Sequence, residues 1–174
     1  MNKRMLMTLA VALMMAAGPV KAGQHGAGDF AFFLTNAFGT NDSFVPGAMG
    51  AGENGSLQPT YNVGYMVSDS IMPYGGFAQQ NWGGGTATML RGGSRFYLAD
   101  RGDVRLFADG ELFIFMSNVD NNDSIGLVGH GGAEYSFSSN FSIGARVGLA
   151  LTDNDAGNSQ VTLGTADVVL GFYF

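Results

Sequence analysis

The sequence has 174 residues, of which 28 are glycine and none is cysteine, and its formal net charge is −6. A chain of this length has room for one domain, and the lack of cysteine excludes disulfides and cysteine-based metal sites. The acidic balance argues against nucleic-acid binding, which needs clustered positive charge.

Residues 1–22 have the features of a secretory signal peptide. The segment begins with two basic residues, continues with an apolar stretch, and ends with Val20 and Ala22 at the positions a signal peptidase reads. We expect cleavage after Ala22, which leaves 23–174 as the mature domain. An uncleaved anchor is the alternative, but the apolar stretch is short for a membrane-spanning helix. The mature part keeps five basic residues and all fourteen acidic ones, so its formal charge is −9.

Beyond this segment, apolar residues recur at every second position in stretches separated by polar or glycine-rich segments. A period of two is typical of β-strands. The predicted strands are 29–38, 58–67, 71–82, 86–98, 104–116, 124–137, 141–152 and 161–174. Their connections alternate in length. Short turns at 68–70, 100–102 and 138–140 fall at one end, and loops at 39–57, 83–85, 118–123 and 153–158 fall at the other.

The last strand is amphipathic and ends on Phe-Tyr-Phe, with Leu170, Phe172 and Phe174 on its apolar face. Such a strand resembles the signal that the insertion machinery of bacterial outer-membrane β-barrels recognises. The usual signal has a glycine five residues before the last, where this chain has Val169.

The whole mature chain looks like the small barrels of the OmpX and OmpA-transmembrane-domain type. The resemblance implies an all-β fold, an eight-stranded antiparallel up-and-down transmembrane β-barrel. It also implies a place in the bacterial outer membrane with both termini periplasmic. The expected partners are the insertion machinery, outer-membrane lipids and lipopolysaccharide, and no nucleic acid.

The distribution of charge decides which face of the sheet points inward. Within each of the last five predicted strands, the charged residues, with His130 counted among them, share one parity, and the other parity is uncharged. A soluble lipocalin-like barrel would turn the charged face outward, whereas a membrane barrel turns it inward. Glycine-rich strands and aromatic strand ends favour the membrane barrel.

An eight-stranded barrel has an interior just wide enough for side chains to fill it. Buried charges must be paired, so we expect a network of ion pairs inside, either a structural plug or a narrow polar pathway. Its predicted members are Asp29, Arg91, Arg95, Arg105, Asp109, Glu111, His130, Glu134, Arg146 and Asp167. Counting across the connections places Arg91 opposite Glu111, Arg95 diagonal to Asp109, Arg146 opposite Asp167 and His130 near Glu111.

The sequence therefore favours a structural or surface-interaction role, with a small channel for water, ions or solutes as the alternative. A lipid-modifying enzyme is a remote third possibility, because His25 and His130 are the only histidines and His130 has inward parity. No catalytic residue, cofactor or metal site is expected. The acidic fragments 120–123 and 153–155 are typical of turns, with a weak divalent-cation site as the alternative.

Overall fold

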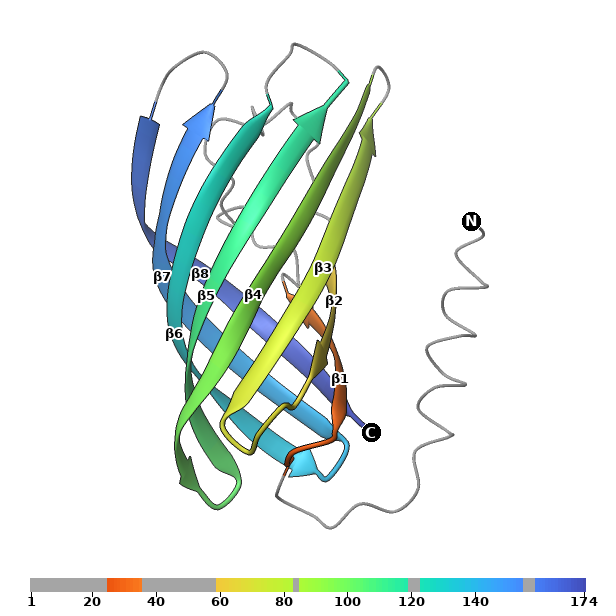
Figure 1. Cartoon of the computed structure of the whole chain (residues 1–174), viewed down its shortest axis with the longest axis vertical. Coiled ribbons are helices and arrows are strands. Elements are labelled where there is room, and N and C mark those ends of the chain that lie inside the picture. The colour runs from red at the N-terminus through yellow and green to blue at the C-terminus, as the bar shows by residue number, and fades with distance from the viewer. Residues whose placement is uncertain (1–24, 36–58, 83–84, 119–122, 155–158) are drawn as a thin grey trace.

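The structure, a computed structural model, describes residues 25–35, 59–82, 85–118, 123–154 and 159–174. Their eight antiparallel strands close into one barrel, in which sequence neighbours pair and the last strand pairs with the first (Figure 1). The strands are β1 Phe30–Thr35, β2 Thr60–Tyr65, β3 Ile71–Trp82, β4 Gly85–Arg101, β5 Val104–Ser117, β6 Ser124–Ser138, β7 Phe141–Asn154 and β8 Ser159–Tyr173. This arrangement confirms the predicted fold class.

The predicted signal segment, residues 1–22, lies outside the described residues. Within the described ranges, no helix is long and apolar enough to cross a membrane.

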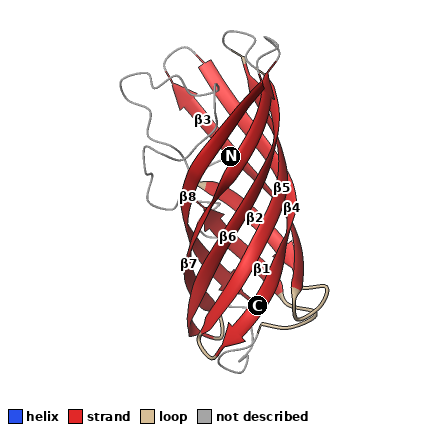
Figure 2. Cartoon of the chain, turned by 90° about the vertical axis from the view of Figure 1, so that its left-hand side faces the viewer, coloured by secondary structure: helices blue, strands red, loops and turns tan. Residues whose placement is uncertain are grey.

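The two ends of the barrel differ in their connections. We call the end that carries the short turns β2–β3, β4–β5 and β6–β7 the turn end, and the opposite end the loop end. The last strand finishes at the turn end, and the strands run steeply tilted between the two ends (Figures 1 and 2). The first two strands are short, with six residues each, whereas β4 has 17. The predicted loop 39–57, and most of 83–85, 118–123 and 153–158, fall outside the described residues. Gly85 is described and begins β4.

The turn between β4 and β5 is shorter than the sequence predicts. Arg101 pairs with Val104, so only Gly102 and Asp103 lie between the strands. Gly102 has a φ of 68°, a left-handed conformation that glycine adopts without steric cost. The β4–β5 ladder also has a register shift close to this turn, between Tyr97 and Ala99 on β4. The prediction of a three-residue turn at 100–102 was therefore wrong, and the register derived from it changes as well.

The outer surface of the wall is apolar, and the buried charged residues lie on its inner surface. Leu163, Leu98 and Val147 face outward and are 78%, 68% and 62% exposed, whereas Arg95 and Arg146 face inward and are each 1% exposed. A soluble barrel has the opposite arrangement, since water would favour the charged face. An apolar outside and a closed ladder of backbone hydrogen bonds are what a lipid environment requires.

Aromatic rings form a continuous outward belt around part of the barrel. Its members contact one another in the order Phe77, Tyr61, Phe32, Phe172, Phe141, Phe137 and Tyr135, with centroid distances between 4.9 and 6.5 Å. The belt links β3, β2, β1, β8, β7 and β6. Girdles of aromatic side chains at the level of lipid headgroups are typical of membrane barrels. The belt includes Phe172 of the predicted insertion signal.

The interior is layered along the barrel axis, an arrangement that the alternation of residues did not predict. A cluster near the turn end contains Ala31, Phe33, Met66, Met72, Tyr74, Tyr97, Phe107, Val169 and Tyr173. A second cluster near the loop end contains Ala87, Phe113 and Phe115, with Met89 and Val128 packed against it. On β5 the residues between these clusters are Asp109 and Glu111, which are both buried. The charged layer thus lies between two apolar layers.

Candidate functional site

Arg146 on β7 is the centre of the charged layer. Its Nη1 donates to Asp109 Oδ2 at 2.9 Å, and its Nη2 donates to Asp167 Oδ2 at 2.7 Å. Nη2 also lies 3.6 Å from Glu111 Oε1. Asp109 and Glu111 come from β5 and Asp167 from β8, so one guanidinium joins three strands. Arg146 is opposite Asp167 in the β7–β8 ladder, as the sequence predicts.

Arg95 on β4 forms the branch of the network toward the turn end. Its Nε donates to Asp109 Oδ1 at 2.9 Å, and its Nη1 donates to Glu134 Oε2 at 3.1 Å. The guanidinium also lies over two rings, with its Cζ 3.9 Å from the centroid of Phe107 and 5.1 Å from that of Phe33. Delocalised charge suits such stacking. The arginine is therefore held by hydrogen bonds at its edges and by aromatic rings on its faces.

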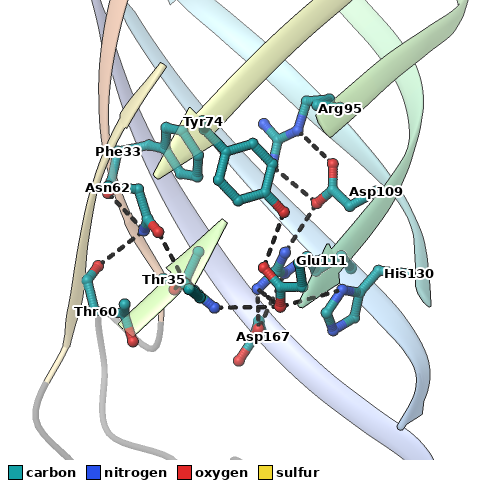
Figure 3. Close-up of polar contacts among 12 residues, drawn as sticks. Phe33, Thr35, Thr60, Asn62, Tyr74, Arg95, Asp109, Glu111, His130 and Asp167 are labelled. Carbon is teal, nitrogen blue, oxygen red and sulfur yellow. Dashed lines mark hydrogen bonds and ion pairs between the residues drawn. The ribbon is translucent and has the colours of Figure 1, made fainter. Parts of the chain in front are cut away.

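Arg91 on β4 forms the opposite branch. Its Nη1 donates to Glu111 Oε1 at 3.3 Å, its Nε donates to Asn62 Oδ1 at 2.9 Å, and its Nη2 donates to Thr35 Oγ1. Tyr74 on β3 donates its hydroxyl to Glu111 Oε2 at 2.8 Å. Both oxygens of Glu111 thus have donors. Figure 3 shows Tyr74, Asp109, Glu111, His130 and Asp167 converging inside the wall.

Together these contacts make one connected network with a member on every strand. The strands β1 to β8 contribute, in order, Thr35, Asn62, Tyr74, Arg91 with Arg95, Asp109 with Glu111, Glu134, Arg146 and Asp167. Three arginines meet four carboxylates. Glu134 also accepts from the hydroxyl of Tyr173, at 3.0 Å to Oε1. Because every strand of the wall contributes a residue, the network extends across the whole lumen.

The register of two predicted pairs was wrong. Arg91 is opposite Phe113 in the β4–β5 ladder, not opposite Glu111, and Arg95 is directly opposite Asp109, not diagonal to it. The two-residue turn and the irregularity beside it shift the strands by two residues relative to the count. The shift is even, so every side chain keeps its face. Arg91 still reaches Glu111 because they are diagonal neighbours and the arginine side chain is long.

Two residues predicted for the network lie elsewhere, at the turn end. Asp29 precedes β1 and accepts a hydrogen bond from Gly26 N through Oδ2, at 2.8 Å. Arg105 donates to the backbone carbonyls of His25 and Asp69, at 3.3 and 2.7 Å. Its Nε lies 3.7 Å from Asp100 Oδ2. Parity alone predicted both residues to face inward, but parity says nothing about height along the barrel.

His130 lies next to the network without a hydrogen bond in it. Its Nδ1 is 3.9 Å from Glu111 Oε1 and has no hydrogen-bond partner. The residue is opposite Asp109 in the β5–β6 ladder, which fits the expectation that it lies near Glu111.

The site also has uncharged members that were not predicted from the sequence: Thr35, Asn62 and Tyr74. The inward parity of Asn62 and Thr35 was a usable signal, because a polar residue inside a narrow barrel must find a partner. Tyr74 lay in a stretch where Pro73 and the glycines 75–76 obscure the alternation.

Glycines opposite the network leave room for its side chains. A Cβ added to Gly132 would meet Ala145 O at 2.6 Å, Phe107 Cζ at 2.6 Å and Arg146 Cβ at 2.9 Å. Real Cβ atoms do not approach other atoms so closely. Glycine at this position therefore leaves the space that the large side chains of Phe107 and Arg146 occupy, as dense packing requires.

One solved structure has a similar fold. The chain is similar to the crystal structure of the N-terminal β-barrel domain of Pseudomonas aeruginosa OprF, with a TM-score of 0.51 and 16% identity. The match covers 86% of this chain and 100% of that chain. No family model and no curated protein sequence matches this chain. The chain therefore has the closed eight-stranded fold of small outer-membrane barrels, which is the fold implied by its resemblance to the OmpX and OmpA type.

Proposed function

We propose that this protein is an integral barrel of a bacterial outer membrane with a structural or surface-interaction role, and that its lumen is plugged by the ion-pair network. The observation that supports this proposal is the dryness of the charged layer. Arg95, Arg146 and Glu134 are at most 2% exposed, and Asp109 and Glu111 are 5% exposed. A water-filled pore would leave such groups accessible, whereas a plug holds them against one another.

The second support is the closure of the layer by all eight strands. A pathway for ions needs a continuous polar surface beside an open space. Here, instead, an apolar cluster lies on each side of the charged layer, one toward the turn end and one toward the loop end. An ion that leaves water would meet Phe113 and Phe115 on one side and Phe33 and Phe107 on the other. Transfer of an ion into such surroundings is costly. A small channel remains the alternative function.

Conductance in planar bilayers tests the plug directly. The purified barrel should give no stable conducting steps in salt solution. Glu111→Ala and Arg146→Ala should each loosen the layer, and Leu112→Ala on the outward face of β5 is the matched control. Steady conductance of the unaltered barrel, changed in size or ion selectivity by Glu111→Ala but not by Leu112→Ala, would favour the channel.

The outer-membrane location has its own test. We propose that residues 1–22 are removed during export, that the insertion machinery reads Leu170, Phe172 and Phe174, and that outer-membrane lipids and lipopolysaccharide surround the barrel. Mass spectrometry of the membrane fraction should find Gly23 as the first residue. Phe174→Asp should leave the chain in the periplasm, whereas Leu163→Ala, at an exposed site on the same strand, should not. Normal assembly of the Phe174→Asp protein would contradict the signal.

A further inference from the structure

The segment before β1 turns back across the turn end of the barrel. Gly28, with a φ of 102°, makes the bend, and the segment then pairs with the end of β2. Gly28 N donates to Met66 O at 2.8 Å, and Met66 N donates to Asp29 O at 2.8 Å. We call the residues His25–Asp29 the latch. It is held to the barrel by a few hydrogen bonds and belongs to no strand.

Side chains fix the other end of the latch. Ala27 N donates to Asp69 Oδ1 in the β2–β3 turn, at 3.0 Å. Arg105 on β5 clamps both segments, because its Nη1 donates to His25 O at 3.3 Å and its Nη2 donates to Asp69 O at 2.7 Å. The guanidinium also lies 3.8 Å from the ring centroid of Tyr97. The latch therefore bridges β2, the β2–β3 turn and β5 across the mouth.

The ring of His25 is the part of the latch that is most deeply buried. It stacks on Tyr173 of β8 with a centroid distance of 3.5 Å and an interplanar angle of 10°. His25 is 3% exposed, and neither ring nitrogen has a hydrogen-bond partner. A neutral imidazole needs to bury only one donor. A protonated imidazole would bury two donors and a charge.

The charged groups around His25 do little to stabilise a protonated imidazole. The positive charge of Arg105 disfavours protonation. The negative charge of Asp29 favours it, but Oδ2 of Asp29 already accepts a hydrogen bond from Gly26 N. The ionisable groups nearest the latch have other partners: Asp69 accepts from Ala27, and Asp100 lies beside Arg105. The hydroxyls of Tyr97 and Tyr173 contact each other, and Tyr173 donates to Glu134. Burial, with Arg105 adding to it, lowers the pKa of His25 from 6.5 to about 4.

We propose that the latch is an acid-released closure of the turn end, seated while His25 is neutral and displaced once His25 is protonated. The displaced latch exposes His25 to water, where the ordinary pKa returns and the proton binds more tightly. Acid therefore favours the displaced state. The ratio of displaced to seated latch should rise about tenfold for each pH unit below 6.5 and level off near pH 4, a change on the order of a few hundredfold.

Amide hydrogen exchange of the complete barrel in lipid or detergent, followed by NMR, measures this ratio. The amides of Gly28 and Met66 report on the latch. Those of Phe30 and Phe174 are the control, because they bond each other's carbonyls at 2.9 and 3.0 Å in the adjoining wall. After correction for the intrinsic pH dependence of exchange, the latch amides should lose protection between pH 6.5 and 4, and the wall amides should keep it. Equal behaviour of both pairs would overturn the proposal.

His25→Phe is the decisive variant. Phenylalanine preserves a ring that can stack on Tyr173 and cannot take up a proton. Protection of Gly28 and Met66 at pH 7.5 should remain, and its loss in acid should disappear. The same acid response in this variant would overturn the proposal. If the phenylalanine fails to seat, the ring titration of His25 in the unaltered barrel decides: a midpoint well below 6.5 supports the latch, and a midpoint at 6.5 overturns it.

Discussion

The middle of the lumen and its turn end hold their arginines in different ways. In the middle, Arg95 and Arg146 each contact carboxylates on other strands within 3.1 Å, and of these carboxylates only Asp167, whose side chain is 12% exposed, is open to water to any extent. At the turn end, Arg105 is held by two backbone carbonyls and a tyrosine ring, and its nearest carboxylate, Asp100, has a side chain that is 42% exposed.

This difference matters because a buried charge responds to the loss of a partner differently from one near water. A charge in the middle cannot find water when its partner is removed, so the full cost of the unpaired charge appears in stability. A charge at the rim can rehydrate. The comparison predicts large and coupled effects in the middle and small effects at the turn end, and each of the following variants tests one part of it.

The largest effect is expected for Asp109→Ala. Asp109 accepts from both Arg95 and Arg146, so the variant leaves two buried arginines short of a partner. The free energy of unfolding should fall by about 3–5 kcal/mol. Urea unfolding in the presence of lipid vesicles measures it. A loss below about 1 kcal/mol would mean that water fills the middle of the lumen, and the contrast between the two regions would disappear.

Tyr74→Phe tests the middle without removing a charge. The hydroxyl of Tyr74 donates to Glu111 at 2.8 Å in a buried environment, and hydrogen bonds to charged groups contribute about 1.5–3 kcal/mol. The same unfolding experiment should show a loss of that size. Tyr135→Phe is the control, because Tyr135 faces outward and is 43% exposed. Equal losses in the two variants would show that the bond to Glu111 contributes nothing of its own.

A pair of adjacent glycines tests whether packing supports the network. Gly132→Ala places a methyl group against Phe107 and Arg146, whereas a Cβ on Gly131 meets nothing within 4 Å. Overpacking costs about 1–3 kcal/mol, so Gly132→Ala should lower the free energy of unfolding by that amount and Gly131→Ala should leave it nearly unchanged. Tolerance of both substitutions would indicate that the lumen has spare room beside Arg146.

The sequence predicted the features that depend on a period of two. Parity placed Arg91, Glu111 and Arg146 on the inner face correctly, because each inward residue is followed by an outward one whatever the length of the turn. Parity could not give the height of Arg105 or Asp29, and it could not show that the β4–β5 turn has only two residues. Uncharged partners such as Tyr74 were not predicted, because the pattern of charge along the strands does not point to them.

The smallest effect is expected for Asp100→Ala at the turn end. Asp100 Oδ2 lies 3.7 Å from Arg105 Nε, and its side chain is exposed enough for water to hydrate the carboxylate. Exposed pairs contribute about 0–1 kcal/mol and weaken as salt rises. The loss in free energy of unfolding should therefore stay below about 1 kcal/mol and shrink further in 1 M salt, while the loss in Asp109→Ala should hardly change.

Unfolding both variants at low and high salt distinguishes the two regions by charge screening alone, since salt reaches Asp100 and does not reach Asp109. A salt-sensitive Asp109→Ala variant would place water in the middle of the barrel and favour the channel over the plug.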